Sequence, residues 1–321
     1  MELFGKFHET IFLKSDSNLE KNINELKEIR NTLHDTSKID KDIKLLEIGL
    51  QGEKEIEFEL KNANIGMYVL HDINIEFEDL KAQIDYVIVT KAYTYLVECK
   101  NMIGNITINE NGEFKRAYNY NGEKIVEGIY SPYRQALRHK EVLKKIWLSK
   151  HNKISAYLWE KSFDSNYKPL VVLTNSKGLL NMRYAPKEIK NATIRSDVLI
   201  EYIKKDIAKY DKNSCFSKKS MESWAQSILN RNVSNNNLDL TKYKNDDINK
   251  NLLTEKLKEY RRNKAKNKNI PAYYIFTDNE MEQIIKLHPK NYDELAKSNI
   301  LNQTKLKFHG AEIIKVINNN N

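Results

Sequence analysis

The residues best suited to chemistry lie in two neighbouring segments, 83–90 and 93–100, that are predicted to be β-strands. Side chains along a strand alternate between its faces, so Glu98 and Lys100 should project to one side of the sheet and Cys99 to the other. The short connection between the two segments favours antiparallel pairing, which would bring Asp85 near Glu98. We therefore expect two carboxylates and one amine at one edge of an otherwise apolar sheet.

This combination suits metal-assisted hydrolysis of a phosphodiester. Asp85, Glu98 and the Cys99 backbone carbonyl offer the hard oxygen ligands that Mg²⁺ or Mn²⁺ prefers. A bound metal lowers the pKa of a water and stabilises charge on the scissile phosphate. Lys100 could orient or deprotonate that water. The plainer interpretation is a Glu-x-Lys ion pair on a solvated sheet face.

Hydrophobic periodicity places these residues within an α/β core. Strands are predicted over 67–75, 83–90, 93–100 and 168–175, with two more over 104–111 and 112–121 joined at Asn111-Gly112. Helices are predicted over 17–35, 40–62, 132–151, 196–209 and 217–231. Ser17 and Ser131 stand at N-cap positions, and Pro132 follows at a first helical position. The pattern predicts a mixed sheet flanked by helices.

Residues 49–175 resemble the NERD family, a nuclease-related domain within the PD-(D/E)XK superfamily. The order helix, strand, Asp-strand, ExK-strand, helix is the one in which PD-(D/E)XK nucleases carry these letters. The matching motifs are Gly52-Glu53, Gln83-Ile84-Asp85, Glu98-Cys99-Lys100-Asn101 with Gly104, and Pro132 with Gln135. The chain departs from the superfamily pattern at Ile84-Asp85, where Pro-Asp is usual.

The resemblance implies roles for five residues. Asp85 and Glu98 would bind the metal, and Lys100 would be the catalytic lysine. Glu53 would enter the site from its helix as an additional acidic residue, through water or a second metal. Gln135 would lie at the margin and touch substrate or order a ligand. Without the resemblance, Glu53 and Gln135 would be read as helix surface residues.

Other residues are given no chemical role. Cys99 faces away from the charges and is interpreted as core. His71, His139 and His151 show no metal-ligand spacing. Two cysteines cannot build a disulfide framework or a Cys-rich zinc site. The chain has no GxxxxGK[ST] motif, so ATP hydrolysis is unsupported.

Residues 250–321 read as a compact helical bundle that resembles the HRDC domain. The matching elements are the LxxxLKxYRR stretch, Pro271-Ala272-Tyr273 with Ile275-Phe276 and Asp278, Pro289 with Glu294-Leu295, and Lys305 with Gly310 and Ile313-Ile314. Asp278 is a predicted N-cap. The segment departs from the family at 299–302, where a glycine-containing turn is common.

The HRDC resemblance implies an auxiliary module that binds nucleic acid weakly or contacts a protein partner. A basic run could supply phosphate contacts: Lys256, Lys258, Arg261, Arg262, Lys264, Lys266 and Lys268. A solvated helix face is the plainer interpretation of this run. Tyr273, Tyr274 and Phe276 could stack on bases, although a core position is expected for all three.

Composition and charge agree with a nucleic-acid partner. The formal net charge of the 321 residues is +9. Residues 241–321 hold 16 Lys and Arg against 10 Asp and Glu, so most of the excess lies there. No segment reads as a secretory signal or a membrane span, so we expect a cytoplasmic protein without membrane contact.

Four regions are expected: an N-terminal helical extension (1–48), the nuclease-like domain (49–229), a linker rich in Asn and Asp (230–249) and the HRDC-like domain (250–321). The apolar stripe of the helix over 17–35 should pack on its own domain, but it could also pair with a second copy to form a homodimer.

The sequence thus predicts a PD-(D/E)XK restriction-endonuclease-like core joined to a small all-α HRDC bundle. The expected function is metal-dependent hydrolysis of nucleic acid, DNA rather than RNA. Two alternatives are a non-catalytic binding or scaffold protein that keeps the nuclease fold, and a subunit of a phage-defence or repair assembly.

Overall fold

The computed structural model describes residues 7–33, 35–149, 153–210, 215–234, 238 and 240–318. The chain forms two compact units. The first comprises residues 1–25 and 42–237, and the second residues 26–41 and 238–321. No helix in the described ranges is both long and apolar enough to cross a membrane.

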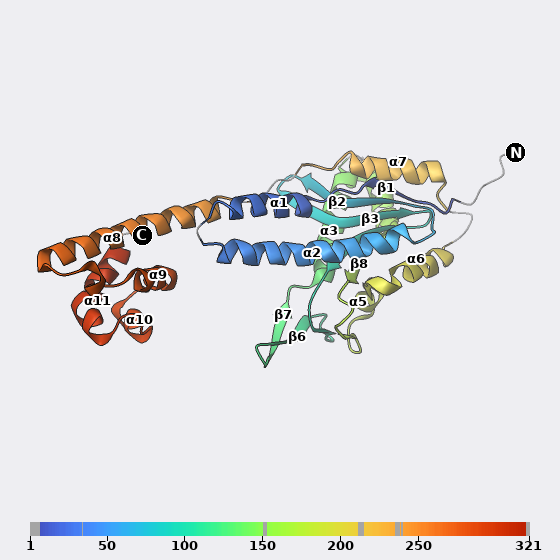
Figure 1. The fold of residues 1–321 in the computed structure, drawn as a ribbon. Coiled ribbons are helices and arrows are strands. Elements are labelled where there is room, and N and C mark those ends of the chain that lie inside the picture. The colour runs from blue at the N-terminus through green and yellow to red at the C-terminus, as the bar shows by residue number, and fades with distance from the viewer. Residues whose placement is uncertain are drawn as a thin grey trace. The chain divides into compact units, whose positions relative to one another are not determined.

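A six-stranded sheet, ordered β1-β2-β3-β4-β8-β10, forms the centre of the first unit (Figure 1). Its strands are β1 (Thr10–Lys14), β2 (Met67–Phe77), β3 (Leu80–Thr90), β4 (Thr94–Lys100), β8 (Tyr167–Leu173) and β10 (Thr193–Arg195). β2, β3 and β4 pair antiparallel, whereas β1–β2, β4–β8 and β8–β10 pair parallel. The sheet is therefore mixed, as predicted.

Helices cover both faces of this sheet. On one face, Ile56 and Leu60 of α2 (Ser37–Lys61) share a core with α6 (Leu199–Ala208). On the other face, α3 (Pro132–Leu148), α4 (Lys153–Asn166) and α7 (Lys218–Leu229) contribute to a second core. The central strands carry apolar residues on both faces because both faces are buried. The predicted α/β fold class is confirmed.

A second sheet, ordered β7-β6-β5-β9, lies beside the main sheet (Figure 1). Its strands are β5 (Asn105–Ile108), β6 (Phe114–Tyr120), β7 (Glu123–Ile129) and β9 (Leu180–Asn181). The predicted hairpin across Asn111-Gly112 joins β5 to β6, with Gly112 at φ 73°. The sequence analysis missed β7, although Asn121-Gly122, both at positive φ, is a typical two-residue hairpin turn. We call the β6–β7 hairpin the arm.

The segment expected as a helical extension also contributes a strand. β1 pairs parallel with β2, starting at Thr10 opposite Met67. α1 (Asn18–Arg30) follows, and the Ser17 hydroxyl accepts a hydrogen bond from the Leu19 amide, as an N-cap should. Ile23 in the apolar stripe of α1 is buried within the chain. The homodimer through this helix stays a prediction. The remaining short elements of the first unit are α5 (Lys187–Ala192) and η1 (Ser196–Val198).

The second unit is helical. It contains α8 (Thr241–Lys268), η3 (Ala272–Tyr274), α9 (Asp278–Leu287), α10 (Tyr292–Lys297) and α11 (Gln303–Asn318). α8 begins inside the segment expected as a linker. The N-cap of α9 is Thr277, which forms a capping box with Glu280; Asp278, expected as the cap, is the first helical residue.

Two local features of the second unit differ from the sequence analysis. Phe276 is fully buried, as expected, but Tyr273 and Tyr274 are more than half exposed. Asn299 adopts φ 54°, which asparagine tolerates better than most residues. An asparagine therefore supplies the left-handed conformation where the HRDC family commonly has glycine.

An ion pair in the second unit predicts acid sensitivity. Burial would raise the pKa of Glu280, but hydrogen bonds from Lys305 and from the Thr277 amide outweigh it and lower that pKa. A depressed carboxyl pKa adds stability above the unfolded-state value, and this stability is lost as pH falls through the folded-state pKa. We expect Lys305→Gln to weaken the loss of stability on acidification. Urea unfolding between pH 7 and pH 3 measures this, and an unchanged pH slope would contradict it.

Candidate active site

Strands β3 and β4 bring Asp85 beside Glu98. The last Cα pair of this ladder is Tyr86–Val97, so Asp85 and Glu98 come next in register. There the Asp85 carboxylate, rather than a backbone carbonyl, accepts the hydrogen bond of the Cys99 amide at 2.6 Å. The carboxylate is thereby fixed at the point where the two strands separate.

Lys100 and Glu98 lie on the same side of β4, as the strand alternation predicted. Lys100 Nζ donates to Glu98 Oε1 at 2.5 Å. Glu98 is only 1% exposed, so this pair is not on a solvated face. Burial would lower the pKa of Lys100, but the attraction of Glu98 outweighs it and raises that pKa. Lys100 is therefore a cation here.

The second carboxylate oxygen of Glu98 lacks a hydrogen bond. Oε2 is buried, and no donor in the described part of the chain reaches it. The nearby His139 Nδ1 lies 3.4 Å away. Burial, with Lys100 and Arg138, lowers the pKa of His139 to about 4, so the ring is neutral at pH 7 and forms no ion pair. Buried polar atoms are rarely left unpaired, which makes this oxygen a candidate ligand atom.

The close approach of several carboxylates also favours the binding of a cation at this site. Burial raises the pKa of Asp85, and the charges of Glu98 and Glu53 raise it further. Burial likewise raises the pKa of Glu98, against the opposing effect of Lys100. In the ranges that the structure describes, no three His, Cys, Asp or Glu side chains are placed to hold a metal together. Two carboxylates with the Cys99 carbonyl and waters suit Mg²⁺, which needs no all-protein cage.

Glu53 enters the site from α2, as the resemblance implied. Its Oε2 accepts hydrogen bonds from His71 Nε2 at 2.8 Å and from Ser17 Oγ at 3.1 Å. The other ring nitrogen of His71 lies 3.0 Å from the Ser15 carbonyl, so both nitrogens face acceptors. Burial would lower the pKa of His71, but Glu53 and the carbonyl raise it above its usual value. The raised pKa favours the protonated form of His71 beside the Glu53 carboxylate.

A glycine allows α2 to approach the strands this closely. A Cβ atom at Gly52 would lie 2.7 Å from Thr174 Oγ1 and 2.8 Å from Asn101 Cβ. Both neighbours directly follow strands of the main sheet, β8 and β4. The Tyr86 hydroxyl secures the approach by donating to the Glu53 carbonyl at 2.8 Å. Gly52 thus sets the depth at which Glu53 enters the site.

Gln135 lies on α3 at the margin of these groups. The predicted cap is present, because Ser131 Oγ accepts from the Arg134 amide. Gln135 lies one helical turn before His139, on the same helix face. Its side chain is half-buried, and no hydrogen bond of its amide group occurs among the described residues. Its amide group is therefore available to a ligand, and the role expected for Gln135 at the margin of the site stays a prediction.

The sequence analysis missed residues of β2 and α3. His71 and His139, which were assigned no role, contact Glu53 and Glu98; His151 lies outside the described residues. Asp72 is also buried, and its carboxylate accepts hydrogen bonds from the Asn18 amide and from the side chains of Asn74 and Gln83. The adjacent His and Asp, among the mostly apolar residues of this strand, were the signal.

The seven basic residues expected to bind nucleic acid do not form one free face of α8. Arg261, Lys264 and Lys258 pair with Asp278, Glu312 and Glu255. Lys256 also has an interaction partner, and Lys268 lies over the Phe308 ring. Arg262 and Lys266 are exposed, one turn apart, and make no ion pair with a described residue. These two are the candidates for phosphate contacts.

Comparison with protein families supports the two resemblances. Residues 48–174 match the family model described as the nuclease-related domain, NERD. Residues 251–317 match the model of the HRDC domain. No curated protein and no solved structure matches the chain. The residues discussed above at the junction of β3 and β4 all lie inside the first matched range. The chain therefore combines a nuclease-related domain with a C-terminal HRDC domain.

Proposed function

We propose that the nuclease-related domain hydrolyses phosphodiester bonds with the help of Mg²⁺ or Mn²⁺, acting on DNA in preference to RNA. The observation that carries this proposal is the buried, unpaired Oε2 of Glu98 beside Asp85 and the cationic Lys100. A buried carboxylate oxygen is rarely left without a hydrogen-bond donor, because its desolvation is costly. The match to a nuclease-related domain supports the reaction class.

Each residue has a role that its surroundings support. Asp85, Glu98 and the Cys99 carbonyl would hold the metal, which would supply an activated water and charge stabilisation. The raised pKa of Lys100 favours a cation that orients the water and stabilises negative charge on the phosphate, over a general base. Glu53, which is hydrogen-bonded to His71, would add a third carboxylate near Asp85 and Glu98 and help to position them. Gln135 would contact substrate or a ligand of the site.

The experiment that tests this function is a cleavage assay on single-stranded, linear duplex and supercoiled DNA with Mg²⁺, Mn²⁺ or EDTA. Wild type is compared with Asp85→Ala and Glu98→Ala. Metal-dependent cutting by wild type alone would establish the nuclease. Binding without cutting on every DNA and RNA tested would instead favour a non-catalytic protein that keeps the nuclease fold.

The HRDC domain supports nucleic-acid binding, and we propose that Arg262 and Lys266 contribute phosphate contacts. Each lost phosphate contact should reduce the slope of log affinity against log salt by about 0.9. We expect Arg262→Gln with Lys266→Gln to lower the slope for duplex DNA by about 2. Lys258→Gln with Lys264→Gln is the control, because both lysines already pair with glutamates. Equal slopes for the two double variants would contradict the assignment.

A further inference from the structure

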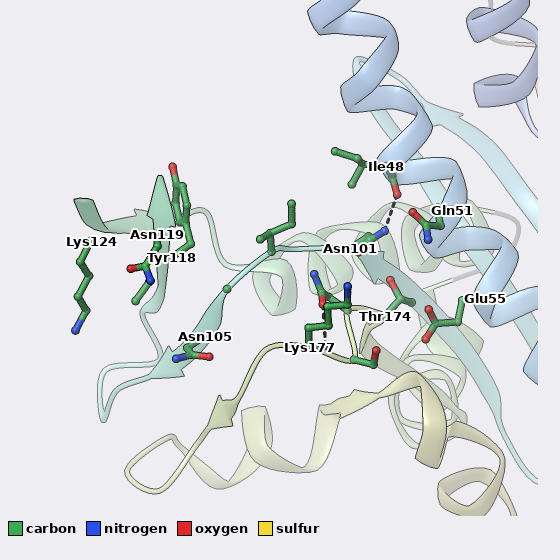
Figure 2. Close-up of a pocket in the computed structure, with 15 residues that line it drawn as sticks. Ile48, Gln51, Glu55, Asn101, Asn105, Tyr118, Asn119, Lys124, Thr174 and Lys177 are labelled. Carbon is green, nitrogen blue, oxygen red and sulfur yellow. Dashed lines mark hydrogen bonds between the residues drawn. The ribbon is translucent and has the colours of Figure 1, made fainter. Parts of the chain in front are cut away.

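A polar pocket of about 630 Å³ lies next to the candidate active site, between α2, the end of β4, the arm and the segment after β8. Figure 2 shows Gln51 and Glu55 of α2 on one side, with Tyr118 and Lys124 of the arm on the other. We infer that this pocket binds one unpaired nucleotide of a single-stranded nucleic acid. The inference rests on the proposed function, since it assigns a substrate form to the same domain.

The floor of the pocket is directly linked to the candidate catalytic strand. Asn101 follows Lys100 in the chain, and Thr174 follows Leu173, which is the register partner of Lys100. The Thr174 amide donates to the Lys100 carbonyl at 3.1 Å. A nucleotide in this pocket would therefore be held on the α2 side of the sheet, at the strand end from which Glu98 and Lys100 project to the opposite side, where α3 lies.

The lining suits the edge of a nucleobase. It contains amide side chains of Gln51, Asn101, Asn105, Asn119 and Asn175. An amide group carries both donors and acceptors, which complement the mixed pattern on a base. Asn101 uses its Nδ2 to bind the Ile48 carbonyl, and Asn105 uses its Oδ1 to accept from the Leu179 amide. Each is thereby held in place with its other amide atom available.

The pocket also provides a ring and two cations. Tyr118 is half-buried, with the Arg116 guanidinium 4.6 Å from its ring centre, and aromatic rings of this kind stack on unpaired bases. Lys124 and Lys177 are exposed and form no ion pair with a described residue, so both could meet phosphates. The carboxylate of Glu55 is held by the Ser196 hydroxyl.

The size and shape of the pocket favour a single-stranded nucleic acid over a duplex. The volume lies within the range of about 300–1,000 Å³ that small-ligand sites have. A duplex is too wide for such a pocket, and its base edges are accessible only through its grooves. Amide groups inside a pocket can read a base only when the base leaves the stack.

The test measures the affinity of the full-length protein for a fluorescent single-stranded DNA oligonucleotide and for the matching duplex, by anisotropy in EDTA. We expect Tyr118→Ala and Lys124→Ala each to weaken single-strand binding by about tenfold. Tyr118→Phe should restore it, because stacking needs only the ring. Duplex binding should change by less than about twofold in all variants.

The two matched controls change residues of β6, the strand of the arm that carries Tyr118. Tyr120 lies on the same face of β6 as Tyr118, and Lys115 is exposed on β6, but neither lines the pocket. Tyr120→Ala and Lys115→Ala should bind like wild type. Equal losses in pocket and control variants, equal losses on duplex, or no loss on single strands would each overturn the inference.

This experiment separates the inference from the proposed function. Binding in EDTA needs no turnover, so a protein that never cuts DNA could still show the pocket-specific loss. Conversely, metal-dependent cutting with unchanged affinities in the pocket variants would keep the nuclease and reject the nucleotide pocket.

Discussion

Replacing Lys100 with alanine is expected to lower the cleavage rate by about a thousandfold while nucleic-acid affinity changes little. The loss of one group that stabilises charge in the transition state typically costs about 10²–10³ in kcat. Lys100 is held against Glu98 inside the domain, so it should act on the scissile phosphate more than on the bulk of the substrate. Single-turnover cleavage and equilibrium binding measure the two effects separately.

A second lysine provides the control for this variant. Lys168 is as exposed as Lys100, about 30% in each case, and it pairs with Asp206 at 2.6 Å in the same unit. Lys168→Ala also removes a half-buried ion pair, so it should destabilise the domain to a similar degree but leave cleavage intact. Retained cleavage in Lys100→Ala would refute the catalytic assignment.

Glu98→Gln is expected to remove both cleavage and stabilisation by Mg²⁺. A ligand that binds only the folded state at about a hundred times its Kd adds about 2.7 kcal/mol to the free energy of unfolding. Glutamine keeps the size of the side chain but offers a poorer ligand than a carboxylate. Thermal unfolding of wild type should therefore shift upward with Mg²⁺, and that of the variant should not.

Asp206→Asn is the matched control for the metal prediction. Asp206 is a buried carboxylate in the same unit, bound by Tyr95 and Lys168 and remote from the β3–β4 junction. This variant should keep the shift with Mg²⁺. A shift of the same size in Glu98→Gln would show that the metal binds elsewhere on the protein.

Strand alternation predicted part of the site correctly. It placed Glu98 and Lys100 on one face of β4, and the antiparallel pairing brought Asp85 close, because a regular ladder connects Tyr86 with Val97. The family resemblance added Glu53 and Gln135, whose positions on different helices no local pattern could give.

Alternation fails where the strands are irregular. Ile84 and Val87 of β3 pack in the same core, as do Leu70 and Ile73 of β2, so both strands change face near Asp72. Asp72 has φ 52°, which breaks the pairing at this point. The register of the two strands is the same on both sides of this interruption. The irregularity depends on hydrogen bonds to Asp72 from residues distant in sequence, such as the Asn18 amide, and the local sequence therefore could not reveal it.

The strands that the sequence analysis missed also depend on contacts with residues distant in the sequence. β1 exists because it pairs with β2, more than fifty residues later in the chain. β7 alternates weakly, and its strand character comes from its partner β6. The contacts of His71 and His139 likewise depend on how α2 and α3 pack, which spacing along the chain does not define.

Gly52 has a consequence for attempts to make this protein more robust. Replacing a glycine inside a helix with alanine is a standard stabilising change, since it restricts the unfolded chain and improves helix propensity. An automated design guided by helix propensity would choose Gly52 early for that reason. Here the added methyl group would meet Thr174 and Asn101 and push the helix, with Glu53, away from the strands. A choice based on helix propensity alone would therefore misjudge this position, and selection for function should keep glycine there.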